Sequence, residues 1–269
     1  MRRPLQGAPD AATRESFPFS VPAIRSLDRL DFRAPVTFLV GENGSGKSTL
    51  LEAIAAAAGL PAVGSESVER DETLAAQRAL GRAVKLAWGV RTRRGFFLRA
   101  EDFFGFAKRV AQQRAEMLQR LAEVDAEFAD ASADTRARAG GPARASLADM
   151  ERRYGVDLDA NSHGQSFLRV FQSRFVPGGL YLLDEPEAPL SPQSQLALMA
   201  MMLDMVARDA QFVVATHSPI LLAFPGACIW SFDETPVAEV QYEELEHVRL
   251  TRDFLNDPQH FLHHLQDHE

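Results

Sequence analysis

The stretch that decides the fold is Gly41-Glu42-Asn43-Gly44-Ser45-Gly46-Lys47-Ser48, which fits the pattern G-x-x-x-x-G-K-[ST] at every fixed position. The run Val36–Val40 precedes it, and an Ala- and Leu-rich run from Leu50 to Ala58 follows it. The first run favours a buried parallel strand, and the second favours a helix that Gly59 ends. A strand, a glycine-rich loop and a helix in this order predict a phosphate-binding loop.

The chemistry of a bound phosphate explains these residue types. Glycines allow consecutive backbone N–H groups to converge on phosphate oxygens, where a Cβ atom would collide. The helix that follows directs its positive dipole end at the anion. We expect Lys47 to reach the β- and γ-phosphates, Ser48 to ligate Mg²⁺ and Thr49 to lie near the α-phosphate. A glycine-rich turn without a ligand is the weaker alternative. The predicted phosphate-binding residues are Gly41, Glu42, Asn43, Gly44, Ser45, Gly46, Lys47, Ser48 and Thr49.

A second apolar run, Leu180–Leu183, ends in the adjacent carboxylates of Asp184 and Glu185. Strand ends in open α/β sheets face the ligand crevice, and two carboxylates there are costly without a cation. We therefore expect Asp184 to hold Mg²⁺ and Glu185 to orient and deprotonate the attacking water. The alternative is a solvated turn after a core strand, and the upstream phosphate loop makes it less favoured.

The composition excludes several classes of protein. The 269 residues are 46% hydrophobic, which is incompatible with a wholly disordered chain or a collagen. A net charge of −8 argues against a protein that coats nucleic acid through bulk charge, although a local basic patch could still bind it. A single cysteine, Cys228, excludes a disulfide framework and a multi-cysteine zinc site. Neither a membrane span nor a signal peptide is predicted, so we expect a soluble cytoplasmic protein.

The pattern along the chain predicts an α/β fold with a mostly parallel sheet flanked by helices, plus a small antiparallel β part and a short helical insert. We expect a flexible arm over 1–12 and a single domain over 13–269. That domain includes a helical insert at about 105–160 and a C-terminal helical tail at about 251–269. Further strands are predicted at Phe17–Val21, Val84–Val90, Gly95–Leu98, Phe212–Ala215 and Cys228–Phe232. Further helices are predicted at Phe106–Ala131, at Leu196–Ala207, and from starts at Thr251 and Asp257-Pro258. Gly140-Gly141-Pro142 is expected to break the helical stretch from Phe106, and Leu147, Met150 and Tyr154 continue it at three-and-four spacing, which predicts a short helical hairpin.

The order of motifs resembles that of ATP-binding-cassette (ABC)-type ATPases, a branch of the P-loop NTPases. Asp184-Glu185-Pro186 resembles the Walker B motif, with Glu185 as the catalytic glutamate. The segment Asn161–Ser166 resembles the family signature, usually L-S-G-G-Q. Ser162, Gly164 and Gln165 match it, whereas Asn161 and His163 depart from it.

Two more segments complete the resemblance, which covers approximately residues 17 to 233. Ala188–Ser191 lies where the family has its D-loop, with Ser191 in place of the usual aspartate, and Ala215–Ser218 looks like the switch-histidine loop. The pattern is closest to predicted soluble AAA-family ATPases and to the heads of RecF and structural-maintenance-of-chromosomes (SMC) proteins.

The resemblance implies Mg²⁺-dependent ATP hydrolysis by a homodimer. In the family, the signature of one subunit reaches the γ-phosphate on the P-loop of another. This chain has one copy of each, so two chains would bind two ATP molecules head to tail. Ser162, His163, Gly164 and Gln165 would form the signature site, and His217 would bind the γ-phosphate. A core or capping histidine is the alternative for His217.

Two expected elements of the family are weak in this sequence. No glutamine ends a strand between the P-loop and the signature, and we hypothesise that Glu101, after the strand Phe96–Ala100, takes its place near Mg²⁺. A solvated carboxylate at a helix start is an equal alternative. Phe17 and Phe19 precede the P-loop where family members stack an aromatic ring on adenine, but core packing explains either ring as well.

The coupled process and its protein partner stay open at this stage. The alternatives to an ATPase that drives a conformational change are an ATP-gated module that binds DNA or a protein, and an ATPase subunit of a transporter. The DNA alternative depends on a basic turn, for which a solvated loop is the simpler account. The turn contains Arg91, Arg93 and Arg94, with Arg82 and Lys85 nearby.

Histidines at helical spacing near the C-terminus invite a metal interpretation, but an amphipathic docking tail is favoured. They are His260, His263, His264 and His268.

Overall fold

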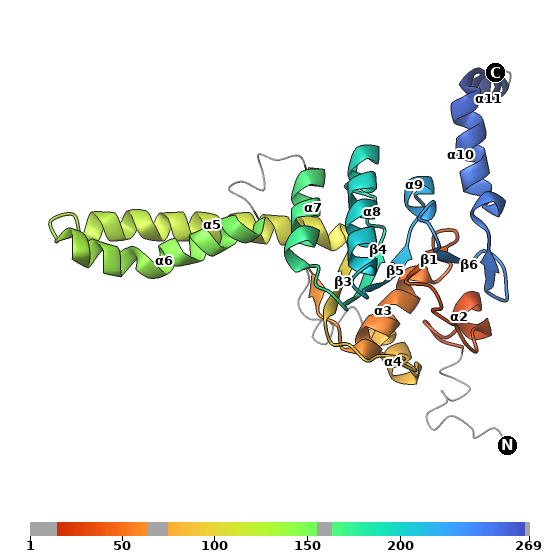
Figure 1. Ribbon diagram of the computed structural model, residues 1–269, viewed down its shortest axis with the longest axis horizontal. Coiled ribbons are helices and arrows are strands. Elements are labelled where there is room, and N and C mark those ends of the chain that lie inside the picture. The colour runs from red at the N-terminus through yellow and green to blue at the C-terminus, as the bar shows by residue number, and fades with distance from the viewer. Residues whose placement is uncertain (1–14, 64–74, 155–162, 267–269) are drawn as a thin grey trace.

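The structure is a computed structural model that describes residues 15–63, 75–154 and 163–266. Within this part of the chain, seven strands form one sheet in the order β2-β3-β4-β5-β1-β6-β7 (Figure 1). All neighbouring strands are parallel except β6 and β7, which form the predicted antiparallel part. The strands are β1 (Val36–Val40), β2 (Ala62–Val63), β3 (Gly95–Arg99), β4 (Leu180–Asp184), β5 (Gln211–Ala215), β6 (Cys228–Ser231) and β7 (Ala238–Val240).

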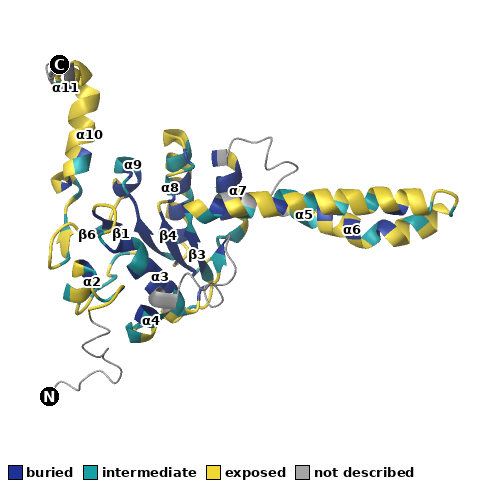
Figure 2. Cartoon of the chain, turned by 180° about the vertical axis from the view of Figure 1, so that it is seen from behind, coloured by how far each residue is buried: buried dark blue, intermediate teal, exposed yellow. Residues whose placement is uncertain are grey.

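Helices cover both faces of the sheet because the side chains of each central strand alternate between two apolar cores. In β1, Phe38 belongs to one core and Leu39 to the other, and both are buried. The Leu39 face packs against α2 (Pro22–Ser26), α3 (Lys47–Ala58) and α4 (Ala75–Ala83). The Phe38 face packs against α7 (His163–Arg174), α8 (Pro192–Val206) and α9 (Pro219–Leu222). Figure 2 shows the strands as the most buried layer.

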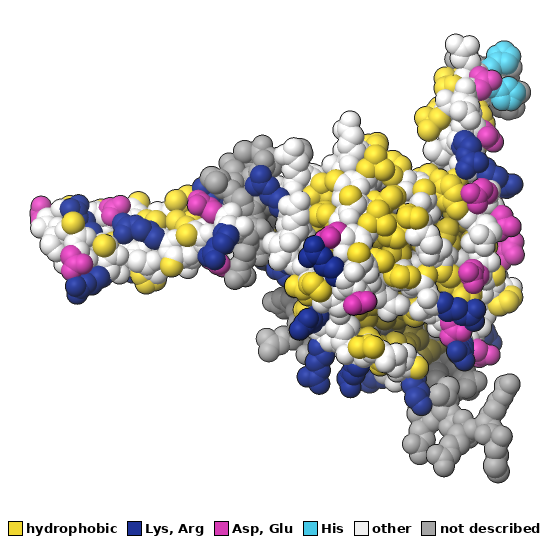
Figure 3. All heavy atoms as spheres, viewed as in Figure 1, with side chains coloured by type: hydrophobic (Ala, Val, Ile, Leu, Met, Phe, Trp, Pro, Cys, Tyr) yellow, Lys and Arg dark blue, Asp and Glu magenta, His cyan; other side chains and the backbone are white. Residues whose placement is uncertain are grey.

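The helical insert is a hairpin of α5 (Ala100–Glu127) and α6 (Ala133–Tyr154), which projects from the body (Figure 1). Val124, Ala143 and Leu147 are buried between the two helices. The prediction that Gly140-Gly141-Pro142 ends a helix is wrong, because α6 continues through Pro142. A Cβ atom on Gly140 would lie 3.2 Å from Leu121 Cδ2, so this glycine allows the two helices to approach closely. Hydrophobic and charged side chains are mixed over the hairpin surface (Figure 3).

A second projection is formed by α10 (Glu246–Asn256) and α11 (Pro258–Gln266), after the short 3-10 helix η2 (Tyr242–Glu244) (Figure 1). The predicted helix start at Pro258 is confirmed. The predicted start at Thr251 is wrong, because α10 begins five residues earlier at Glu246, where Leu245 and Val248 are buried in the core. Beyond this anchor, the apolar side chains are largely exposed: Leu250, Phe254, Leu255 and Leu262.

Two predicted strands are absent from the described residues, and packing explains each case. Residues 17–21 form turns that lead into α2, and Val21 is the N-cap residue of that helix. Residues 84–90 have no strand, because β3 already pairs with β2 on one side and with β4 on the other. Their side chains Val84, Leu86 and Trp88 instead pack against the Leu39 core. No described helix combines the length and the apolar character that a membrane span requires.

Candidate functional site

The predicted phosphate loop lies at the carboxyl end of β1, and the side chain of Lys47 folds back onto the loop. Lys47 Nζ donates hydrogen bonds to the carbonyl oxygens of Gly41 (2.6 Å) and Glu42 (2.8 Å). Glycine is required at positions 41 and 46 of the loop, because a Cβ atom there would make close contacts and because φ is positive, +145° at Gly41 and +104° at Gly46. A Cβ atom on Gly46 would lie 2.9 Å from Val21 Cγ1, so the turn before α2 packs directly on the loop.

The start of α3 and the carboxyl end of β4 bring two of the predicted Mg²⁺ ligands together. Ser48 Oγ donates a hydrogen bond of 3.1 Å to Asp184 Oδ1, across 136 residues of sequence. Asp184 is only 7% exposed, and burial raises its pKa to about 6, while the hydrogen bond from Ser48 opposes the shift. A hydroxyl and a carboxylate are hard oxygen donors, so they fit Mg²⁺, which keeps its other ligands from water and phosphate. No group of three or more His, Cys, Asp or Glu side chains among the described residues could hold a metal alone.

Glu185 follows Asp184 in a strained conformation. Its φ angle is +49°, unusual for a residue with a Cβ atom, and its N–H donates to the carbonyl of Ala215 at 2.9 Å. Strain of this kind persists where the surroundings enforce it and is concentrated at functional sites. The turn leaves Glu185 exposed at the edge of the sheet, beside the buried Asp184.

Lys47 is the centre of a cluster of carboxylates. Burial lowers the pKa of its ammonium, and the surrounding negative charges oppose that shift. These charges belong to Glu185, Asp184, Asp233 and Glu187. Four carboxylates around one lysine create a negative site, and a divalent cation would balance its charge.

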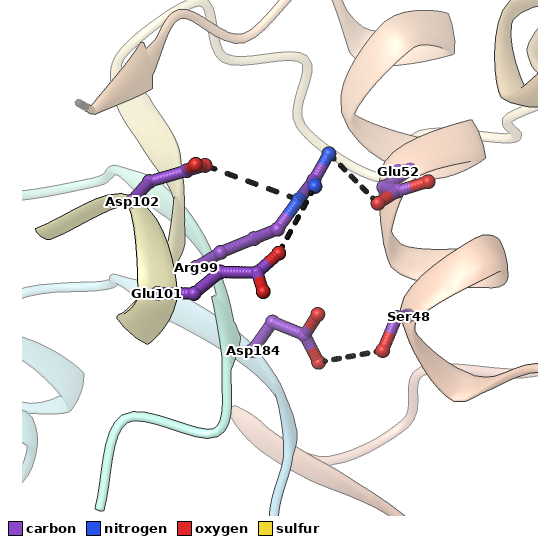
Figure 4. A network of polar contacts seen from close by, with 6 residues as sticks. All are labelled: Ser48, Glu52, Arg99, Glu101, Asp102 and Asp184. Carbon is purple, nitrogen blue, oxygen red and sulfur yellow. Dashed lines mark hydrogen bonds and ion pairs between the residues drawn. The ribbon is translucent and has the colours of Figure 1, made fainter. Parts of the chain in front are cut away.

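Arg99, at the end of β3, is a site residue that sequence reasoning missed. It is the register partner of Asp184 and forms a buried ion pair with Glu52 of α3, with Nη2 2.8 Å from Oε1 (Figure 4). Arg99 also contacts Glu101 (3.3 Å) and Asp102 (3.9 Å) in the first turn of α5. Its position at a strand end beside the P-loop could have been found by aligning the ends of the parallel strands.

Glu101 lies closer to solvent than its predicted role requires. Its side chain is 75% exposed and bound to Arg99, and Glu101 is the second residue of α5 instead of the end of the strand (Figure 4). The register position beside Asp184 is occupied by Arg99. A role for Glu101 near Mg²⁺ stays a prediction.

Between β4 and the P-loop strand β1, His217 follows β5 as predicted. Its backbone N–H donates to Glu187 Oε1 at 2.7 Å, while its ring atom Nε2 is buried and has no protein partner within the described residues. The next residue, Ser218, caps α9 and donates to Gln195 Oε1 at 2.5 Å, which fixes the loop against α8. His247 of α10, which sequence reasoning also missed, lies next to His217 with 6.4 Å between the ring centroids.

The predicted signature is only partly described. Asn161 and Ser162 lie outside the described residues, and α7 begins at His163. The expectation of a helix start near Ser166 is therefore wrong, because Gly164 and Gln165 already belong to the first turn. A Cβ atom on Gly164 would lie 3.1 Å from the carbonyl oxygen of Pro189 in the predicted D-loop. Gly164 of the predicted signature thus lies close to the backbone of the segment predicted to be the D-loop.

The remaining candidates do not converge on the P-loop. Phe17 is 53% exposed, and Phe19 packs against the Leu39 core. The residues of the predicted basic turn are exposed in a loop before β3: Arg91, Arg93 and Arg94. Of the C-terminal histidines, His268 lies outside the described residues, and the others are part of α11.

Comparison with known proteins matches two segments of the chain. A model described as "AAA domain" matches residues 19–79, and one described as "AAA domain, putative AbiEii toxin, Type IV TA system" matches residues 166–223. The search of curated proteins found no significant match.

Among solved structures, a dimeric bacterial ABC transporter cassette is 19% identical, covering 79% of this chain and 88% of that chain with a TM-score of 0.39. The Smc head domain from Pyrococcus furiosus is 11% identical, covering 81% and 92% with a TM-score of 0.37. The cbiO1 protein from Clostridium perfringens, part of an ABC transporter complex, is 17% identical, covering 88% and 90% with a TM-score of 0.38.

The segment 19–79 contains the predicted P-loop, and the segment 166–223 contains His217. Two segments of the chain are thus similar to AAA domains, and the mostly parallel sheet brings the P-loop and His217 to one edge.

Proposed function

We propose that this chain binds and hydrolyses ATP with Mg²⁺ and couples the cycle to a conformational change in a protein partner. The single observation that carries the proposal is the hydrogen bond between Ser48 and Asp184. It joins the residue after the P-loop lysine to the end of the acidic strand, so the two predicted Mg²⁺ ligands meet beside the predicted phosphate site.

Each residue then has a defined task. Lys47 exchanges its carbonyl partners for the β- and γ-phosphate oxygens, and the loop N–H groups with the start of α3 bind the remaining charge. Ser48 and Asp184 would hold Mg²⁺, which neutralises charge on the phosphates. Glu185, exposed at the turn, orients water and accepts its proton, and His217 donates a hydrogen bond to the γ-phosphate.

Homodimerisation on ATP is part of this proposal. Gly164 and Gln165 lie at the start of α7, where N–H groups and the helix dipole favour an anion. One chain contains a single P-loop and a single signature, so a second copy would supply the signature to each ATP. The chain would thus form a head-to-tail homodimer that closes around two ATP molecules.

Two variants test the proposal together. Glu185→Gln should bind ATP but hydrolyse it at least about 100-fold more slowly, and it should elute as a dimer with ATP and Mg²⁺. Lys47→Ala should lose ATP binding and remain a monomer. Glu127→Gln, at the exposed far end of α5, is the matched control and should behave as the wild type. Unchanged ATP affinity in Lys47→Ala would overturn the P-loop assignment.

A further inference from the structure

His247 lies at the edge of the predicted nucleotide site, although it comes from the C-terminal helix α10. Its ring centroid is 6.4 Å from that of His217, with the ring planes at 67°. The Nε2 atoms of both rings are buried and have no hydrogen-bond partner within the described residues. Buried polar atoms are nearly always paired, so two neighbouring imidazoles that are unpaired in this way point to a shared ligand.

The framework that holds His247 is the one that holds the His217 loop. Leu245 and Val248, on either side of it, are buried in the core. Tyr242 donates its hydroxyl to the carbonyl of Pro219 at 3.0 Å, and Pro219 begins the helix that Ser218 caps. The two histidines are therefore held in a fixed relation.

The charges around His247 connect it to the phosphate loop. Asp233, at the end of β6, accepts a hydrogen bond from the Glu42 N–H at 2.7 Å. The same carboxylate attracts both Lys47 and His247. Burial lowers the pKa of His247, and the neighbouring His217 lowers it further. The His247 ring is therefore held mainly neutral, with one nitrogen as a hydrogen-bond donor and the other as an acceptor.

A terminal phosphate suits two adjacent ring N–H donors, because it offers several acceptor oxygens to each. We propose that His247 is a second γ-phosphate-binding residue, which contacts the terminal phosphate of ATP together with His217. This inference rests on the proposed ATPase function. It adds a residue from the C-terminal projection to the site and makes α10 sensitive to the presence of the γ-phosphate.

The test compares ATP with ADP, because only ATP carries the group that His247 would contact. In a Glu185→Gln background with Mg²⁺, His247→Leu should weaken ATP binding about tenfold or more and leave ADP binding within twofold. His247→Gln keeps a donor of similar length and should recover part of the ATP affinity. Arg249→Ala, exposed two residues further along α10, is the control and should change neither.

Each outcome decides a separate point. If His247→Leu leaves the ATP affinity unchanged, the inference is overturned. An equal loss of affinity for ATP and for ADP also overturns it, because it indicates a structural role for His247. If His247→Leu is poorly folded by thermal unfolding, the ATP-to-ADP ratio of His247→Gln decides instead, and an unchanged ratio overturns the inference. If the parent protein itself binds no ATP, the proposed function fails before His247 is tested.

Discussion

Two groups of strand ends near the P-loop are built on different principles: the ends of β3 and β4 (the β3–β4 flank), and the ends of β5 and β6, the two strands that pair with β1 (the β5–β6 flank). On the β3–β4 flank, the charged groups have protein partners: Arg99 with Glu52, and Asp184 with Ser48. On the β5–β6 flank, His217 and His247 present buried ring nitrogens without such partners among the described residues. A buried ion pair or hydrogen bond between protein groups is costly to break, whereas a buried ring nitrogen without a protein partner leaves its hydrogen bond for a ligand. The first flank should therefore control stability, and the second should control nucleotide recognition.

The largest expected effect on stability comes from breaking the Arg99–Glu52 pair. Arg99→Met should lower the free energy of unfolding by about 3–5 kcal/mol, because the buried Glu52 carboxylate loses its ion pair with Arg99. Equilibrium urea unfolding without nucleotide measures the change. The double variant Arg99→Met/Glu52→Leu should recover much of the loss.

The other flank supplies the comparison for this result. His247→Gln should change the unfolding free energy by less than about 1 kcal/mol, because no protein hydrogen bond of its buried Nε2 is lost. Arg138→Ala, which breaks an exposed pair on α6, should have a similarly small effect. Equal losses in Arg99→Met and His247→Gln would remove the distinction between the flanks.

A smaller, pH-dependent effect is expected at Asp184. Its pKa rises from the ordinary 3.8 to about 6 in the folded chain, so the folded state binds more protons than the unfolded state between these values. Stability conferred by the protonated form is thus lost as the pH rises from about 4 to about 6. The cost above pH 6 is on the order of 3 kcal/mol.

Asp184→Asn removes this ionisation. With EDTA present, the variant should be little different from the wild type near pH 4 and clearly more stable at pH 7.5. Asp204→Asn, an exposed carboxylate on α8, should follow the wild type at both pH values. A stability difference between Asp184→Asn and the wild type that is independent of pH would contradict the assigned pKa.

The smallest effect on stability is expected at Glu101. Its side chain is 75% exposed, so Glu101→Gln should change the unfolding free energy by less than about 0.5 kcal/mol, although it contacts Arg99. The turnover of the same variant tests its predicted place near Mg²⁺. Full Mg²⁺-dependent turnover would remove Glu101 from the site.

Local sequence signals predicted the parts of the site that are contiguous. The P-loop, the acidic end of β4 and the histidine after β5 each combine a strand with a polar turn, so pattern alone located them. Arg99 and His247 were missed because their roles depend on strand register and on the docking of a C-terminal helix. The strand predicted at Val84–Val90 failed for a similar reason: its pattern suited a strand, but both edges of β3 were already occupied.

The direct junction between β3 and α5 has a mechanical consequence. β3 ends at Arg99 and α5 begins at Ala100, so no flexible linker separates the strand from the long helix. The 28 residues of α5 span about 42 Å at 1.5 Å per residue. A rotation of about 5° at Arg99 would displace the far end of a rigid helix of that length by roughly 4 Å. The hairpin would thus act as a lever, in which a small rotation at its base becomes a displacement of several ångströms at its tip.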